Sequence, residues 1–173
     1  MSEPTAIGTD PITERYVVVA SDGSPGALGA ATVAAELFGQ VARFEIVTVI
    51  PRPRVPGDDA TGFAGPALDP DEVARLNDEH RVEGDGIVAA TARHLGPQPA
   101  AMRVLMGDPA EALLAHIRDV RPDVVVVGAS GHGRPAGTLL GSVAWKLVAD
   151  ASCPVLVAPR SAIPADPPAP GDD

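Results

Sequence analysis

The chain has 173 residues, 45% of them hydrophobic and only 3% aromatic, so one domain can bury a core built from Ala, Val, Leu and Ile. The net charge of −10 and the pI near 4.7 argue against a nucleic-acid-binding surface, which needs a basic stripe, and against docking on an anionic membrane. The single cysteine, Cys153, excludes an intramolecular disulfide and a cysteine zinc cluster, and its apolar setting predicts an inert, buried thiol.

The two ends of the chain differ from its middle. Residues 1–14 are polar with two prolines, and we interpret them as a flexible arm. They lack the basic start and apolar stretch of a signal peptide, and no apolar run approaches the roughly 20 residues that span a bilayer. We therefore expect a soluble, cytoplasmic protein with one folded domain at 15–159. Residues 160–173, rich in Pro, Ala and Asp, are expected to be disordered.

Apolar runs bounded by Gly and Pro predict five short strands. The helices between them start at a capping side chain followed by proline, as in Ser24-Pro25, Asp69-Pro70 and Asp108-Pro109, and the last opens at Gly141-Ser142. Residues 51–69, rich in Pro, Gly and Asp, are a long loop that we predict to be disordered or ordered only on binding. The expected strands are 16–20, 44–50, 101–106, 124–127 and 154–158, and the expected helices are 25–38, 70–95, 109–121 and 142–150.

Strands that alternate with helices indicate an α/β fold, in which a parallel sheet carries helices on both faces and right-handed crossovers join the strands. Ligands bind such sheets at the C-terminal ends of the strands, where the strand order reverses. With the order 3-2-1-4-5, the reversal lies between the first and the fourth strand. Asp22 follows the first strand and Gly128 ends the fourth, so both are expected beside one crevice.

The segment 124–142 reads V-V-V-V-G-A-S-G-H-G-R-P-A-G-T-L-L-G-S. A strand, a glycine-rich loop and a helix start form an anion-binding arrangement, because backbone N–H groups approach phosphate closely and the helix adds unpaired donors. The alternative is that these glycines only form the turns of the loop. Two other phosphate motifs are absent: the only lysine, Lys146, lies outside any G-x-x-x-x-G-K pattern, and no G-x-G-x-x-G occurs. The spacing is G-x2-G-x9-G-S, at Gly128, Gly131, Gly141 and Ser142.

This spacing resembles the nucleotide-binding signature of the universal stress protein family. V-V-V-A-S-D-G-S at 17–24, G-D-P-A-E at 107–111 and C-P-V-L-V-A-P at 153–159 extend the resemblance over 15–159, in the family's order. The resemblance implies a five-stranded parallel sheet of order 3-2-1-4-5, a Rossmann-like fold similar to that of the adenine nucleotide alpha hydrolases. It also implies a bound adenine nucleotide: ATP with Mg²⁺, with AMP or a cyclic nucleotide as alternatives.

The resemblance assigns roles by position. It places Ala20 and Ser21 beside the nucleotide, Val49 at the adenine, and Asp22 at the ribose or the Mg²⁺–phosphate region, as a candidate metal ligand. A carboxylate that stabilises its own turn is the alternative for Asp22. The remaining candidates are Gly128, Gly131, Gly141 and Ser142 at ribose and phosphates, Val143 alongside, and His132 and Arg134 as loop residues that either neutralise phosphate or are merely solvated.

The last strand would leave Val155, Leu156 and Val157 at a sheet edge, where pairing with a second copy would give a homodimer of the kind common in the family. The function that these features favour is that of a homodimeric sensor or signalling module that binds ATP in the stress response. A slow ATPase or another nucleotide-dependent enzyme is one alternative, although no residue stands out as a general base. A nucleotide-free module that recruits partners is the other.

Overall fold

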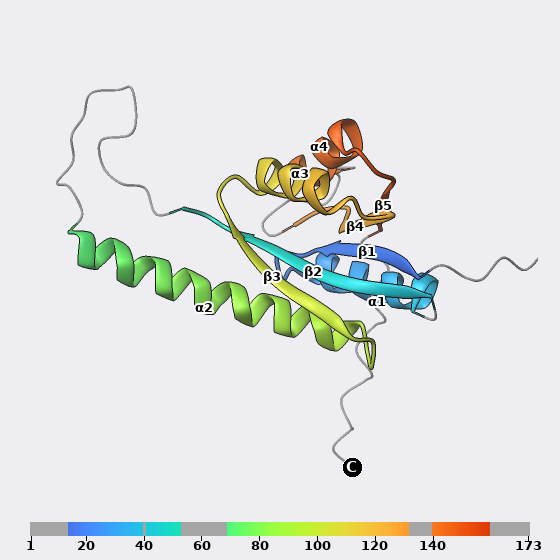
Figure 1. Cartoon of the computed structure of the whole chain (residues 1–173), viewed down its shortest axis with the longest axis horizontal. Coiled ribbons are helices and arrows are strands. Elements are labelled where there is room, and N and C mark those ends of the chain that lie inside the picture. The colour runs from blue at the N-terminus through green and yellow to red at the C-terminus, as the bar shows by residue number, and fades with distance from the viewer. Residues whose placement is uncertain (1–13, 40, 53–68, 132–139, 160–173) are drawn as a thin grey trace, which may run out of the picture.

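The structure is a computed structural model that describes residues 14–39, 41–52, 69–131 and 140–159. In these ranges, parallel strands alternate with helices along the chain (Figure 1). The strands are β1 (Arg15–Ala20), β2 (Ala42–Ile50), β3 (Ala100–Met106), β4 (Val124–Gly128) and β5 (Val155–Ala158), and the helices are α1 (Pro25–Phe38), α2 (Pro70–His94), α3 (Pro109–Val120) and α4 (Ser142–Asp150).

The strands form one sheet in the order β3-β2-β1-β4-β5, which confirms the predicted fold. β1 lies at the centre, because Ala20 pairs with Val47 of β2 on one side and with Val127 of β4 on the other. From β1 the chain moves outward to β2 and β3, and from β3 it returns across the sheet to β4 and then β5. The strand order therefore reverses between β1 and β4, as the sequence predicted.

Both faces of the sheet are covered by helices, as Figure 1 shows. Alternation along β1 sends Val17 and Val19 to the face where α1 and the C-terminal half of α2 pack, and Val18 to the face where α3 and α4 pack. Because each face is covered, the central strands are apolar on both sides and read as continuous runs of valine. The core thus has two apolar layers built from small side chains.

Three of the four described helices begin with the side-chain cap that the sequence predicted. Ser24 Oγ accepts a hydrogen bond from the Ala27 N–H at 3.3 Å, and Asp69 Oδ1 accepts one from the Asp71 N–H at 3.2 Å. Asp108 Oδ1 accepts two hydrogen bonds from the first turn of α3, at 3.1 and 3.0 Å. α4 differs, because Gly141 precedes it and supplies no side-chain cap.

Several sequence predictions lie outside the described residues and stay predictions. These are the flexible arm except for its last residue, nearly all of the long loop, and the tail at 160–173. Within the described ranges, no helix combines the length and the apolar character needed to cross a membrane. Cys153 is half-buried, and burial raises the pKa of its thiol, which supports the predicted lack of reactivity.

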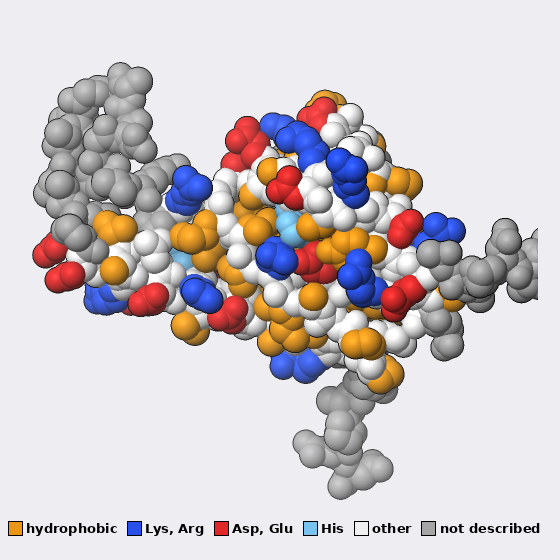
Figure 2. Space-filling model, in the orientation of Figure 1, with side chains coloured by type: hydrophobic (Ala, Val, Ile, Leu, Met, Phe, Trp, Pro, Cys, Tyr) orange, Lys and Arg blue, Asp and Glu red, His pale blue; other side chains and the backbone are white. Residues whose placement is uncertain are grey.

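The charged side chains mix on the face of the molecule that Figure 2 presents. Lys and Arg side chains there lie among Asp and Glu side chains, without forming a continuous basic stripe. Proteins bind double-stranded nucleic acid through clustered cations that neutralise its phosphates, and this face has no such cluster.

A buried glutamate, which the sequence analysis did not single out, joins four elements of the fold. Glu45 of β2 is only 3% exposed, yet it carries a carboxylate. Arg103 Nε of β3 donates to its Oε1 at 2.6 Å, and His116 Nε2 of α3 donates to its Oε2 at 2.9 Å. The hydroxyl of Tyr16 on β1 also donates to Oε2, and Arg43 lies over the Tyr16 ring. The carboxylate therefore has a donor from each neighbouring element.

These donors keep Glu45 ionised. Burial alone would raise its pKa, but the hydrogen bonds from Tyr16, Arg103 and His116 outweigh burial and lower the pKa below its ordinary value. Burial and the bond to Glu45 raise the pKa of Tyr16 to about 12, so the phenol stays a donor. Because the folded pKa of Glu45 lies below its unfolded pKa, its contribution to stability is present above the unfolded pKa and is lost as pH falls through the folded one.

We predict that Glu45→Ala lowers the free energy of unfolding by about 3 kcal/mol at pH 7, because removing one member of a buried charged network strands the others. Urea denaturation followed by circular dichroism would measure this. Glu83→Ala on the exposed side of α2 is the control and should change stability by less than about 0.5 kcal/mol. The deficit of Glu45→Ala should shrink as pH falls below the ordinary pKa of a glutamate, since the unfolded wild-type chain then binds a proton that the folded carboxylate does not. A deficit that stays constant to pH 3 would contradict the assigned ionisation.

Candidate functional site

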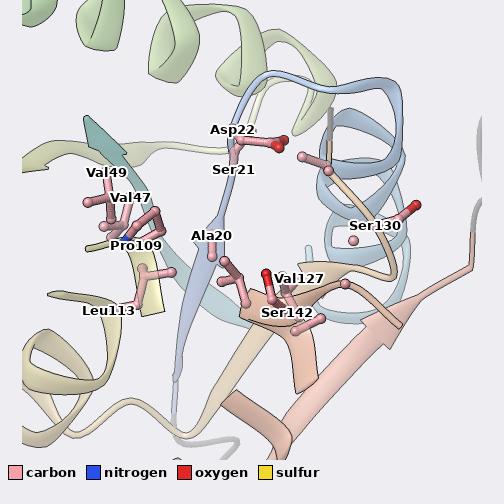
Figure 3. Close-up of a pocket in the computed structure, with 16 residues that line it drawn as sticks. Ala20, Ser21, Asp22, Val47, Val49, Pro109, Leu113, Val127, Ser130 and Ser142 are labelled. Carbon is pink, nitrogen blue, oxygen red and sulfur yellow. The ribbon is translucent and has the colours of Figure 1, made fainter. Parts of the chain in front are cut away.

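A cavity of about 290 Å³ opens at the C-terminal ends of β1 and β4, where the strand order reverses. Five segments wall it: the end of β1 with the following loop, the first turn of α1, the C-terminal half of β2, the start of α3, and the end of β4 with its following loop and the start of α4. This is the place where an open parallel sheet accepts a ligand, because the crossovers on its two sides leave in opposite directions. Figure 3 shows the residues that line the cavity.

The structure brings together the residues that the sequence predicted for the site, as far as they are described. His132 and Arg134, the two secondary candidates, lie outside the described residues. The predicted residues that line the cavity are Ala20, Ser21, Asp22, Val49, Gly128, Gly131, Gly141, Ser142 and Val143.

Sequence reasoning missed part of the wall. Val47 lies two residues before Val49, and strand alternation was a signal that could have placed both on one face. Pro109 and Leu113 lie one helical turn apart at the start of α3, which itself begins at the C-terminal edge of the sheet. The other lining residues that were missed are Ala27, Val127, Ser130 and Ala144.

The cavity has an apolar end and a polar end. Val47, Val49, Pro109 and Leu113 gather on one side in Figure 3, while Asp22, Ser130 and Ser142 lie on the other side. An apolar slot next to convergent polar groups is the usual form of a small-molecule site, in which the apolar part supplies affinity and the polar part supplies orientation.

Backbone groups rather than long side chains form much of the polar end. The Gly141 N–H donates to the Ala129 carbonyl at 2.7 Å, which holds the start of α4 against the loop after β4. α4 has no side-chain cap, so the N–H groups of its first turn remain available to a ligand beside Ser142 and Val143. A helix N-terminus also carries a partial positive charge, which favours an anion at this end of the cavity.

Ser21 lines the cavity, and its hydroxyl forms a hydrogen bond with α2. Its hydroxyl is buried and lies 2.8 Å from Thr91 Oγ1 of α2, which in turn donates to the Ile87 carbonyl. Since Thr91 uses its proton on that carbonyl, Ser21 donates to Thr91. The side chain of Ser21 thus ties the end of β1 to α2.

Asp22 makes the local turn contact that was the alternative for it, and its side chain also lines the cavity. Its Oδ1 accepts a hydrogen bond from the Ser24 N–H at 3.0 Å, which is the local turn contact. The same side chain is exposed and lines the cavity, and a Cβ placed on Gly131 would overlap its Oδ2. The carboxylate therefore lies directly against Gly131, at the polar end. In the described part of the chain, no group of three or more His, Cys, Asp and Glu side chains gathers as a metal site built from protein ligands alone would require.

Comparison with known proteins gives one consistent family. The sequence profile described as "Universal stress protein family" matches residues 15–159. A universal stress protein of Thermus aquaticus, named for its place beside a QAH/OAS sulfhydrylase gene, is 34% identical over 146 residues, which cover 83% of this chain and 97% of that protein. A universal stress protein A-like protein of Arabidopsis thaliana is 40% identical over 63 residues, a match that spans only 36% of that protein.

A solved structure supports the fold and carries a ligand. It is titled as the crystal structure of a universal stress protein in complex with cAMP, and it is 26% identical to this chain. The superposition has a TM-score of 0.57 and covers 83% of this chain and 96% of that one. The five-stranded sheet described above is therefore shared with a solved member of the family.

The contact between Asp22 and Gly131 predicts energetic coupling between them. Gly131→Ala should lower the free energy of unfolding by about 1 kcal/mol, because the added Cβ forces the Asp22 carboxylate out of its turn. In an Asp22→Ala background the same change should cost clearly less, which gives a coupling of at least about 0.5 kcal/mol in a double-mutant cycle measured by urea denaturation. Additive costs would show that the carboxylate does not occupy this position.

Proposed function

The chain belongs to the universal stress protein family, and from that premise we propose that its cavity binds an adenine nucleotide. ATP is the proposed ligand, with AMP or a cyclic nucleotide as alternatives. The protein would act in the cytoplasm as a homodimeric sensor or signalling module of the stress response. Its output would depend on whether the nucleotide site is occupied.

One observation carries this proposal: the cavity has an apolar slot at one end and a helix start with uncapped N–H groups at the other. A nucleotide has the same polarity, with a flat apolar base at one end and phosphates at the other. Val49 and Leu113 would hold the base, and the backbone of Gly131, Gly141 and Ser142 would hold the phosphates. The related protein whose structure is titled as a cAMP complex supports an adenine nucleotide as the ligand class.

Mg²⁺ is proposed to enter with the nucleotide. Mg²⁺ is usually held by one or two carboxylates together with phosphate oxygens and water, rather than by an all-protein cage. The exposed carboxylate of Asp22 at the polar end suits that donor set, and no second described acid of the lining is needed. The ion would neutralise phosphate charge, a contribution that matters in a protein of net charge −10.

We propose binding without fast turnover. Among the described residues that line the cavity, Asp22 is the single ionisable side chain, and one of its oxygens already accepts the Ser24 N–H. A general base must reach the proton of an attacking water while it keeps a free lone pair in the right direction. Slow hydrolysis remains the enzymatic alternative, and the nucleotide-free module remains the other.

The homodimer is proposed to form through β5. Among the described strands β5 pairs only with β4, so its outer backbone groups lie at the edge of the sheet. Val155, Leu156 and Val157 are only half-buried there. Trp145 and Val148 of the neighbouring helix α4 are 64% and 55% exposed, which adds apolar surface close to this edge.

The nucleotide proposal predicts that freshly purified protein, once denatured, releases an adenine nucleotide that chromatography can identify. If the protein is purified empty, titration calorimetry with Mg-ATP should show binding, as should the fluorescence of Trp145, the only tryptophan of the chain, one turn into α4 from Ser142. Release of ADP or AMP would favour the slow enzyme. No release and no heat would leave the nucleotide-free module as the better explanation.

Charge at the start of α4 provides a sharper test. Ser142→Asp should weaken Mg-ATP binding at least tenfold, because it places a negative charge beside the proposed phosphates. An acidic residue in the first turn favours a helix, and Ser142 is exposed, so the fold should survive. Ser142→Ala is the matched control and should stay within about threefold, since the backbone donors remain. If the two variants weakened binding equally, the phosphates would not lie at this end of the cavity.

The dimer proposal predicts a species of twice the chain mass in sedimentation velocity. Val155→Lys should shift it to the monomer, because two-fold pairing would bring the added charges of two copies together at an edge. Leu37→Lys is the control, since Leu37 is 58% exposed on α1, and α1 packs on the face of the sheet opposite to α4. Thermal melting should show that both variants remain folded. A Val155→Lys protein that still sediments as a dimer would place the interface elsewhere.

A further inference from the structure

The first turn of α1 and the loop after β4 are in direct backbone contact behind the cavity. A Cβ placed on Gly26 would lie 2.7 Å from the Ser130 carbonyl oxygen. A Cβ placed on Gly128 would lie 2.7 Å from both the carbonyl carbon and the carbonyl oxygen of Gly26. Such distances are shorter than real Cβ contacts allow, and the obstructing atoms are backbone, which cannot rotate away as a side chain can. The two segments meet this closely only because both positions lack a side chain.

The opposite side of the same loop is held by α4. Gly141 donates its N–H to the Ala129 carbonyl at 2.7 Å, and a Cβ there would lie 3.4 Å from Ser130 Cα. The Ala129 N–H donates in turn to the Ala158 carbonyl of β5 at 2.9 Å. The loop is therefore confined between α1 on one side and α4 with β5 on the other. A side chain added on α1 at this contact would displace the loop toward α4.

We propose that Gly26 is a positioning residue for the polar end of the cavity. Gly26 makes up none of the described lining, although its neighbour Ala27 does. It acts by letting α1 approach the Ser130 carbonyl, and this approach sets where the backbone from Gly128 to Gly131 lies relative to the start of α4. This inference rests on the proposed nucleotide binding for its consequence, but its structural part stands on the packing alone.

Gly26 lies next to two segments that form the polar end: the loop after β4 and the turn after β1. Gly26 lies two residues after Ser24, which caps α1 and whose N–H holds Asp22. A side chain at position 26 would displace the loop that carries Gly131, the turn that carries Asp22, or both. The apolar end belongs to β2 and α3, which the displacement does not reach directly. Binding groups need placement within about 0.5 Å, so the effect should fall on the phosphates rather than on the base.

The test compares Gly26→Ala with two other Gly→Ala variants. Gly84→Ala on α2 is the structural control, since a Cβ there would lie 2.6 Å from Val104 Cγ1 on the face of the sheet away from the cavity. Gly86→Ala is the open control, because no atom lies within 4 Å of its added Cβ. Calorimetric titrations with Mg-ATP and with adenosine then separate the two ends of the cavity in each variant.

Gly26→Ala should weaken Mg-ATP binding about tenfold while adenosine binding changes by less than about twofold, a split that general destabilisation does not produce. Gly84→Ala should lower the melting temperature and leave the ratio of the two affinities unchanged, and Gly86→Ala should change neither. An unchanged ratio in Gly26→Ala, or an equal loss of both ligands, would overturn the positioning role.

A second readout needs no nucleotide. In the free protein, amide hydrogen exchange at Gly141 reports the bond to the Ala129 carbonyl, which the displaced loop would strain. Exchange at Gly141 should accelerate at least tenfold in Gly26→Ala and remain unchanged in Gly84→Ala. If the wild type binds neither ATP nor adenosine, the proposed function fails, and this exchange measurement still decides the packing role of Gly26. Unchanged exchange at Gly141 would overturn it.

Discussion

The parallel pairing of β1 with β4 sets the position of the cavity and of the helices around it. Val17 to Ala20 pair with Val124 to Val127, and the partner strand on the other side of β1 is β2. Crossovers that leave β1 in one direction and reach β4 from the other put their helices on opposite faces of the sheet. The C-terminal ends of these two strands are therefore left open, and the cavity lies there because neither crossover can cover it.

The polar end of this cavity is built largely from backbone, which explains how an acidic chain can offer a site to an anion. Backbone N–H groups and a helix N-terminus supply positive potential locally, whatever the net charge of the surface. This arrangement requires glycine, since two backbone segments can approach this closely only where side chains are missing. Gly128 and Gly131 thus satisfy two demands at once: they expose the loop, and they make room for α1 and for the Asp22 carboxylate.

The two ends of the sheet are linked through α3. Its first two turns supply Pro109 and Leu113 to the cavity, and one turn beyond Leu113 His116 donates to the buried Glu45. Glu45 also accepts hydrogen bonds from β1 and β3, so the network fixes α3 against three strands of the sheet. A buried charge stabilises a fold only when its partners are in place, and such networks favour one arrangement of the elements over its alternatives. The network therefore also fixes Pro109 and Leu113, the part of the apolar wall that α3 supplies.

The helices and strands, and nine of the residues that line the cavity, were predictable from the amino-acid sequence alone. Short-range signals decide these features: valine runs define strands, and caps such as Ser24-Pro25 and Asp108-Pro109 define helix starts within a residue or two. The strand order and the family signature then placed nine residues at one cavity. The residues that complete the wall of the cavity, and those that lie behind it, become visible only in the folded chain. Glu45 meets His116 across 71 positions of the chain, and Gly26 meets Ser130 through atoms of the backbone. Such contacts have no local signature, because they depend on how closely two separate elements approach, and that distance is set by the packing of the whole core.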